Sequence, residues 1–141
     1  MKRCCHCFFE NEDVNAICTS CGKNIEVQVM DSEDPRFLPV GSVLQNRYQI
    51  GDAVGMGGFG ITYAAWDNLL GQKVAIKEYL PGEFSTRTFG ELEVTIYGGE
   101  KEEQFNAGKT KFYEEAIKLS AFQEIEGIVS IYNSFNENKT A

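Results

Sequence analysis

The spacing of hydrophobic and polar residues predicts three consecutive strands in the middle of the chain. In RYQIGDAVG (47–55), Tyr48 and Ile50 alternate with polar residues, and ITYAAWD (61–67) is rich in β-branched and aromatic residues. The turn-like DNLLGQ then separates ITYAAWD from the apolar KVAIKEYL at 73–80. These segments are expected to form antiparallel strands, and the connection between the first two is rich in glycine.

The rest of the chain predicts a further strand or hairpin and then a helix. In ELEVTIYGG (91–99), Leu92, Val94 and Ile96 alternate on one face. The helix is predicted after the two glycines by apolar residues at intervals of 7, 4 and 3, which form one stripe: Phe105, Phe112, Ala116 and Leu119. EEAIKLSAF is its strongest part, and GIVSIYNSF (127–135) returns to the spacing of a strand.

The first 24 residues predict a small metal-binding module. Four of the five cysteines follow the pattern C-x2-C-x10-C-x2-C, and they are Cys4, Cys7, Cys18 and Cys21. Two thiolates separated by two residues bind one metal ion from a tight turn, and two such turns complete a tetrahedron. The sequence has no secretion signal, which argues against disulfides. We therefore predict a zinc ribbon that folds on its metal, with iron in a rubredoxin-like site as the main alternative.

Cys5 and His6 lie inside the first cysteine pair but are not expected to be ligands. Either residue has the chemistry to replace a member of that pair, yet the symmetric spacing favours the four cysteines. His6 is expected to be an exposed residue of the knuckle. It is also the only histidine of the chain, so a Ser-His-Asp triad is excluded.

These patterns divide the chain into three segments. A zinc ribbon at 1–24 and a folded domain at 47–141 are joined by a linker at 25–46. The linker contains the acidic DSEDPRFLP, with two of the three prolines of the chain. The formal charge is -8, which argues against nucleic acid as a partner. No stretch reaches the ~20 apolar residues of a membrane span. We expect a cytoplasmic location.

The glycine-rich hexapeptide GMGGFG (55–60) is typical of phosphate-binding loops. Gly55, Gly57 and Gly60 also fit the motif of dinucleotide-binding folds, and Glu78 lies where those folds place an acidic residue for the ribose. A helix must begin after the last glycine of such a fold, because its N-terminus faces the pyrophosphate. The sequence here continues as a strand, so a dinucleotide-dependent oxidoreductase is disfavoured.

The order of strand, glycine turn, strand and VAIK (74–77) is typical of protein kinases. Residues 47–140 resemble the N-terminal lobe of a bacterial Ser/Thr protein kinase, of the type with FGITY after the loop and YLP after the lysine. The resemblance implies an α+β fold, in which the zinc ribbon precedes an antiparallel sheet and an αC helix. It also places the chain's last residues before the fifth strand of that sheet.

The resemblance assigns roles in an ATP site to specific residues. The flap over the nucleotide phosphates consists of Gly55, Gly57, Gly58 and Gly60, with Phe59 at its tip. Val54 and Ala75 are expected to lie on the adenine. Thr62 stands where the family usually has valine and keeps the β-branched shape.

Two charged residues complete this part of the implied site. Lys77 is expected to pair with the α and β phosphates and with a glutamate of the following helix. The helix motif matches Glu115, which precedes Ala116 and lies four residues before Leu119. The segment 78–111 between lysine and helix is longer than the usual connection, which suggests a docking insert, a regulatory insert or a spacer.

Phosphoryl transfer in this family needs ATP, Mg²⁺, a catalytic-loop Asp, an Asn and a D-F-G motif. These motifs are not among the 141 residues. We therefore expect an N-terminal fragment of an ATP-dependent Ser/Thr protein kinase that acts on a protein substrate as a complete enzyme. Alone, it is expected to be inactive and to bind nucleotide weakly. The alternative is a non-catalytic interaction module.

A missing fifth strand would also affect self-association, because that strand lies between the third and fourth in the family. Two strand edges and apolar surface would then be unpaired, around Val74, Ile76, Val129 and Ile131. We expect a homodimer or a strand swap that fills the gap.

Overall fold

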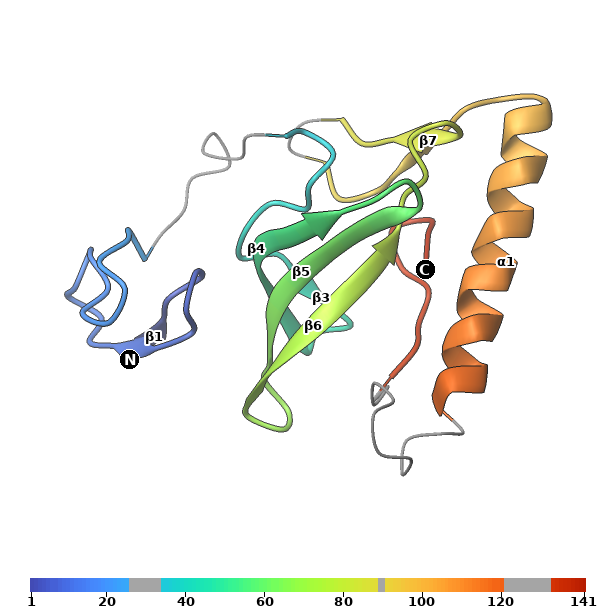
Figure 1. Ribbon diagram of the computed structural model, residues 1–141. Coiled ribbons are helices and arrows are strands. Elements are labelled where there is room, and N and C mark those ends of the chain that lie inside the picture. The colour runs from blue at the N-terminus through green and yellow to red at the C-terminus, as the bar shows by residue number, and fades with distance from the viewer. Residues whose placement is uncertain (26–33, 89–90, 121–132) are drawn as a thin grey trace.

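The computed structural model describes residues 1–25, 34–88, 91–120 and 133–141. It is an α+β structure with a curled antiparallel sheet and the helix α1 (Glu100–Ser120). A small N-terminal module carries the paired cysteines. The sheet lies between this module and α1 (Figure 1).

The central sheet has the strand order β3-β4-β5-β6. It consists of β3 (Val43–Leu44), β4 (Tyr48–Met56), β5 (Gly60–Asp67) and β6 (Gln72–Tyr79), and all neighbouring strands are antiparallel. The three strands expected from the hydrophobic pattern are therefore confirmed. The β5–β6 ladder is regular, whereas the β4–β5 register shifts between Ile50 and Ala53 and again before Gly55.

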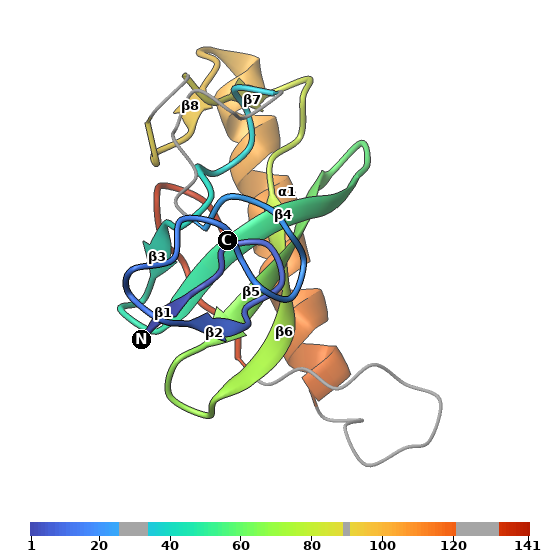
Figure 2. The ribbon, with the colours of Figure 1, turned by 90° about the vertical axis from the view of Figure 1, so that its left-hand side faces the viewer.

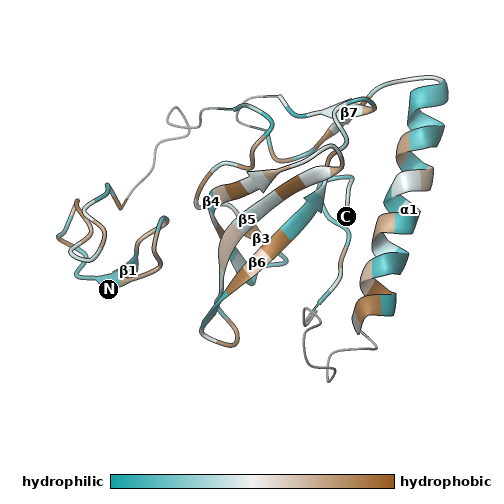
Figure 3. Ribbon diagram, viewed as in Figure 1, coloured by the Kyte–Doolittle hydropathy of each residue, from teal (hydrophilic) through white to brown (hydrophobic). Residues whose placement is uncertain are grey.

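The core forms on one face of this sheet, because alternate residues of each strand point the same way. Ile50, Ile61, Tyr63 and Ala65 are buried there, and the half-buried Val74 and Ile76 pack against them. Hydrophobic residues lie mainly on the sheet, whereas α1 is largely hydrophilic (Figure 3). Val129 and Ile131 lie outside the described residues, and the dimer stays a prediction.

The 78–111 segment contains a second, two-stranded sheet of β7 (Ser85–Thr86) and β8 (Thr95–Ile96). The hairpin predicted around residues 91–99 is thus confirmed only in part, because two of those residues form a strand. Val94 is 3% exposed but Leu92 is 41% exposed, so the expected common face is not maintained. The short strand pairs with Ser85–Thr86, a partner that the periodicity did not indicate.

The helix predicted after the two glycines is confirmed as α1. Its apolar stripe is most buried at its N-terminal end, where Phe105 is fully buried, and Leu119 is 36% exposed. The rings of Phe105 and Phe112 lie 5.0 and 5.5 Å from that of Tyr79 at the end of β6. The strand expected at 127–135 falls mostly outside the described residues, and 133–135 are not in a strand.

The N-terminal module pairs β1 (Lys2–Arg3) with β2 (Glu10–Asn11) and has a small core of its own, formed by Cys4, Cys18 and Ile25. Figure 2 shows this module in front of the sheet. The predicted linker, 25–46, is only partly a connection, since Leu38 is 1% exposed in the main core and β3 belongs to the central sheet. The domain boundaries themselves stay a prediction.

Candidate functional site

The four cysteines of the C-x2-C pairs form one cluster, as predicted. The Sγ atoms of Cys4, Cys7, Cys18 and Cys21 all lie within 4.8 Å of one another. The Sγ–Sγ distance is 3.7 Å between Cys4 and Cys21 and 3.6 Å between Cys7 and Cys18. A tetrahedron with metal–sulfur bonds of ~2.3 Å has edges of ~3.8 Å, so the cluster fits a tetrahedral ion such as zinc.

Hydrogen-bond donors surround the sulfur atoms, which suits thiolates. The Cys4 sulfur accepts from the His6 N–H at 3.4 Å, and the Cys18 sulfur accepts from the Ser20 N–H at 3.4 Å and from the Asn11 amide at 3.5 Å. Burial raises the pKa of Cys4 to about 12. Burial also acts to raise the pKa of Cys18, but N–H donors outweigh it and lower that pKa to about 6.

Cys5 and His6 lie outside this cluster, in agreement with the sequence prediction. The expectation that His6 is exposed is wrong, because its side chain is 17% exposed and contacts the lobe. Its Nδ1 atom lies 2.8 Å from Oδ1 of Asp52 on β4. Sequence position alone gives no sign of this contact between the module and the sheet.

The glycine-rich loop connects β4 and β5 as a tight turn, and the Gly57 N–H donates to the Gly60 carbonyl at 2.9 Å. Gly60 is required for packing, since a Cβ atom there would lie 1.9 Å from the carbonyl oxygen of Glu78. A Cβ at Gly55, Gly57 or Gly58, in contrast, would meet nothing within 4 Å. The protein's own packing therefore does not explain why these positions are glycine.

Three of the residues assigned to the nucleotide, Thr62, Ala75 and Lys77, share one face of the sheet. Thr62 pairs with Lys77 and Ala64 pairs with Ala75, so their side chains point to the same side. Ala75 and Lys77 are exposed, and Val54 is 65% exposed. Phe59 at the loop tip is 73% exposed. The structure therefore leaves this face open beside the loop.

Lys77 and Glu115 are not paired in this structure. Among the described residues no ion pair joins Lys77 to any carboxylate within 4.0 Å; its Nζ atom lies 5.7 Å from the ring centroid of Phe112. Glu115 is exposed and lies three residues after Phe112, which is a rise of ~4.5 Å along the helix. Lys77 thus faces α1 about one turn before Glu115.

A cavity of about 240 Å³ lies next to the loop but not on this face. It is lined by Met56, Gly57 and Gly58 of the loop and by Ile61, whose side chain points to the core face. Neither Ala75 nor Lys77 lines it. We therefore do not assign this cavity to the nucleotide.

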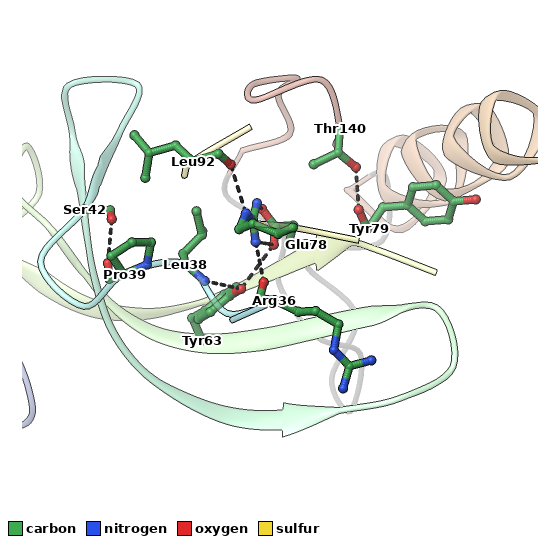
Figure 4. Close-up of polar contacts among 10 residues, drawn as sticks. Arg36, Leu38, Pro39, Ser42, Tyr63, Glu78, Tyr79, Leu92 and Thr140 are labelled. Carbon is green, nitrogen blue, oxygen red and sulfur yellow. Dashed lines mark hydrogen bonds and ion pairs between the residues drawn. The ribbon is translucent and has the colours of Figure 1, made fainter. Parts of the chain in front are cut away.

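Directly behind Lys77, a buried polar network anchors β6. Glu78 accepts two hydrogen bonds from Arg87, of 2.9 and 2.7 Å, and a third of 3.1 Å from the Tyr63 hydroxyl. Arg87 also donates to the carbonyls of Arg36 at 2.7 Å and Leu92 at 3.0 Å. Figure 4 shows that these groups converge from strands and loops far apart in the sequence.

This network has no counterpart in the predictions from the sequence. The position of Glu78 in the sequence suggested only a ribose-binding acid, whereas Glu78 faces the core and is 5% exposed. Arg87 is 2% exposed, and its ion pair with Glu78 raises its pKa against the effect of burial. The pairing of Glu78 with Arg87 was not predictable, because two charged residues nine positions apart form no recognisable sequence pattern.

The comparisons with known proteins support a kinase-like lobe. The chain is similar to the solved structure of PpkA-294 in its apo form. PpkA is a bacterial Ser/Thr kinase. The match has 35% sequence identity and a TM-score of 0.69, and it covers 74% of this chain and 36% of the PpkA chain. No protein-family model and no curated protein matches the chain. The chain thus spans about a third of the matched kinase structure and resembles a kinase N-terminal lobe preceded by a cysteine cluster.

Proposed function

We propose that this chain is the nucleotide-binding lobe of an ATP-dependent Ser/Thr protein kinase, with a zinc ribbon at its N-terminus. The observation that carries the proposal is the open glycine loop beside Ala75 and Lys77, in a chain that is 35% identical to PpkA over the matched region. Phosphate oxygens bind backbone N–H groups at close range, and a Cβ atom would interfere with that approach. This explains glycine at positions where the fold itself does not need it.

Each residue has a role in binding rather than in bond breaking. The N–H groups of the loop would hold the phosphates, and Val54 and Ala75 would lie against the adenine. The Lys77 ammonium would neutralise the α and β phosphates. Bound Mg²⁺ would add charge neutralisation between the phosphates, through residues that a complete kinase supplies from outside this sequence.

Glu115 is not paired with Lys77 in the present structure. The lysine faces Phe112, three residues before Glu115, so pairing requires new side-chain rotamers or a movement of α1. An ion pair of this kind in the family controls whether the lysine is positioned for phosphate. We propose that the described arrangement is the form before this pairing.

The test is a titration of the chain with Mg-ATP, observed by the amide NMR signals of Gly55–Gly60. We expect weak binding, with a dissociation constant of about 1 mM, because the titrated chain provides only the contacts of an N-terminal lobe and none from the second lobe of a kinase. Lys77→Met is expected to weaken binding by about tenfold, since it removes a charge-assisted contact to phosphate.

Lys73→Met is the matched control. Lys73 is an exposed lysine of the same strand and the same face, four residues before Lys77 and farther from the loop. If both variants bind Mg-ATP as tightly as the parent chain, or if the loop signals do not move, the proposed nucleotide site is refuted.

The second candidate is a non-catalytic interaction module. The unpaired Lys77 and exposed Glu115 favour it, because an intact lysine–glutamate pair is the feature a working kinase requires. The same titration separates the two functions, since a pure interaction module has no reason to bind Mg-ATP through Lys77.

A further inference from the structure

The cysteine knuckle of residues 3–8 lies on a defined patch of the exposed sheet face, formed by Gln49, Gly51 and Asp52 of β4 and Trp66 of β5. We call this the sheet patch. Trp66 pairs with Lys73 in the regular β5–β6 ladder, so it shares a face with Thr62, Ala75 and Lys77. The knuckle therefore occupies the same face as the proposed nucleotide site, at the end away from the loop.

A carboxylate of the patch contacts two polar side chains of the module. Nδ1 of His6 lies 2.8 and 3.0 Å from the two carboxylate oxygens of Asp52. The ammonium of Lys23, beside the second cysteine pair, lies 3.8 Å from the same carboxylate. Both cysteine pairs thus direct a polar side chain to Asp52.

An aromatic contact lies beside this polar one. The Arg3 guanidinium carbon is 3.9 Å from the Trp66 ring centroid, which is a close cation–π distance. The ring of Phe8 lies 6.1 Å from that of Trp66, and Phe8 is 4% exposed although it belongs to a module of about 25 residues. Phe8 is buried by the sheet.

Backbone approaches backbone at Gly51. A Cβ atom there would lie 2.6 Å from Cζ of Phe8 and 2.8 Å from the carbonyl oxygen of Cys5. The amide of Gln49 also lies 3.5 Å from the Cys5 sulfur. Because residue 51 is a glycine, the knuckle packs directly against β4.

The residues that contact the sheet patch lie next to the cysteines of the metal cluster in the sequence. His6 lies between the ligands Cys4 and Cys7, and its N–H donates to the Cys4 sulfur. The Phe8 N–H donates to the Cys4 carbonyl at 2.9 Å. A module of about 25 residues has too small a core to fold on its own, so an ion bound by the four cysteines would stabilise this shape.

We propose that the sheet patch is a docking surface for the metal-loaded knuckle, so that metal binding controls the order of β4 where it leads into the glycine loop. Asp52 is three residues before Gly55, in the stretch where the β4–β5 register shifts twice. A stretch with an interrupted ladder is held by fewer regular hydrogen bonds. Contacts from the knuckle therefore restrain it more than they would a regular strand.

The experiment compares the zinc-loaded chain with the chelated chain by three measurements. Trp66 is the only tryptophan, so its emission reports the knuckle contact directly. Amide hydrogen exchange of residues 51–56 reports the order of β4, and far-UV circular dichroism reports the sheet as a whole. On chelation we expect a red shift of Trp66 emission, exchange about tenfold faster at 51–56 and an unchanged sheet signal.

Asp52→Ala tests the interface without touching the metal ligands. We expect it to retain metal, seen as an intact thiolate charge-transfer band with cobalt, and to show exchange about fivefold faster at 51–56. Glu83→Ala is the control, because Glu83 is an exposed acid of the same lobe outside the patch.

Three outcomes would overturn the proposal: no change in Trp66 emission and exchange on chelation, loss of the whole sheet on chelation, or equal exchange in the two variants. The first means that the knuckle is not docked through its metal. The second means that the metal supports the entire lobe, and the third that Asp52 is not part of a docking surface. None of these measurements uses nucleotide, so their result is independent of the proposed kinase function.

Discussion

Replacing Arg87 by methionine is expected to destabilise the lobe strongly. Methionine keeps a long apolar side chain but removes all four hydrogen bonds of the guanidinium. The side chains of Arg87 and Glu78 are 0% and 6% exposed, so the carboxylate left behind has little access to water. Removing one partner of a buried ion pair costs about 3–5 kcal/mol, because the other charge is then uncompensated.

The assay is urea unfolding of the zinc-loaded chain, observed by far-UV circular dichroism. With a slope of about 1–3 kcal/mol per molar urea, a loss of ~3 kcal/mol lowers the midpoint by about 1 M or more. The matched control is Glu93→Gln, which breaks the ion pair with Lys139 at 3.3 Å. Both of its side chains are 62% exposed. A surface pair of this kind contributes about 0–1 kcal/mol.

A second substitution separates charge from packing in this variant. Glu78→Gln removes the carboxylate that Arg87→Met leaves buried without a counter-charge, so the double variant should recover part of the lost urea midpoint. A penalty no larger than that of Glu93→Gln, or one that Glu78→Gln does not reduce, would refute the electrostatic role of the network.

Two further predictions concern the sheet and the helix. Gly108→Ala should destabilise the chain by about 1 kcal/mol despite the higher helix propensity of alanine, because the new Cβ would lie 2.2 Å from the Tyr79 hydroxyl oxygen. Thermal unfolding measures this loss of stability. The control is Gln104→Ala, at an exposed position of the same helix, which should be neutral or stabilising. A stabilising Gly108→Ala would contradict the close contact between α1 and β6. The hydrogen-bonded ion pair with Arg47 lowers the pKa of Asp67 to about 2. Its contribution to stability is complete above the ordinary pKa of about 3.9 and is lost as the pH falls through about 2, so Asp67→Asn should flatten the acid limb of a stability–pH curve between pH 4 and 2. An unchanged acid limb would show that the pair does not act in this way.

Features that depend on local spacing were predictable from the sequence alone. Alternation around Tyr48 and Ile50 predicted strand β4, and the apolar stripe that includes Phe105 predicted α1, because both periods come from backbone geometry. Two cysteine pairs with short internal spacing predicted one metal cluster, because each pair binds from a single turn. The strand pattern of residues 61–67 distinguished the glycine loop from a dinucleotide-binding loop, since strands and helices have different hydrophobic periods.

Which charged groups meet depends on the tertiary structure. Glu78 and Arg87 form a pair because a short hairpin folds back over the core face, and His6 meets Asp52 because a module 46 residues earlier docks on β4. Such contacts depend on how layers pack and leave no period in the sequence. The same holds for Glu115, which was assigned by motif to Lys77 but lies about one helical turn beyond it. A motif names the residues of a site, whereas the position of α1 against β6 decides whether they touch.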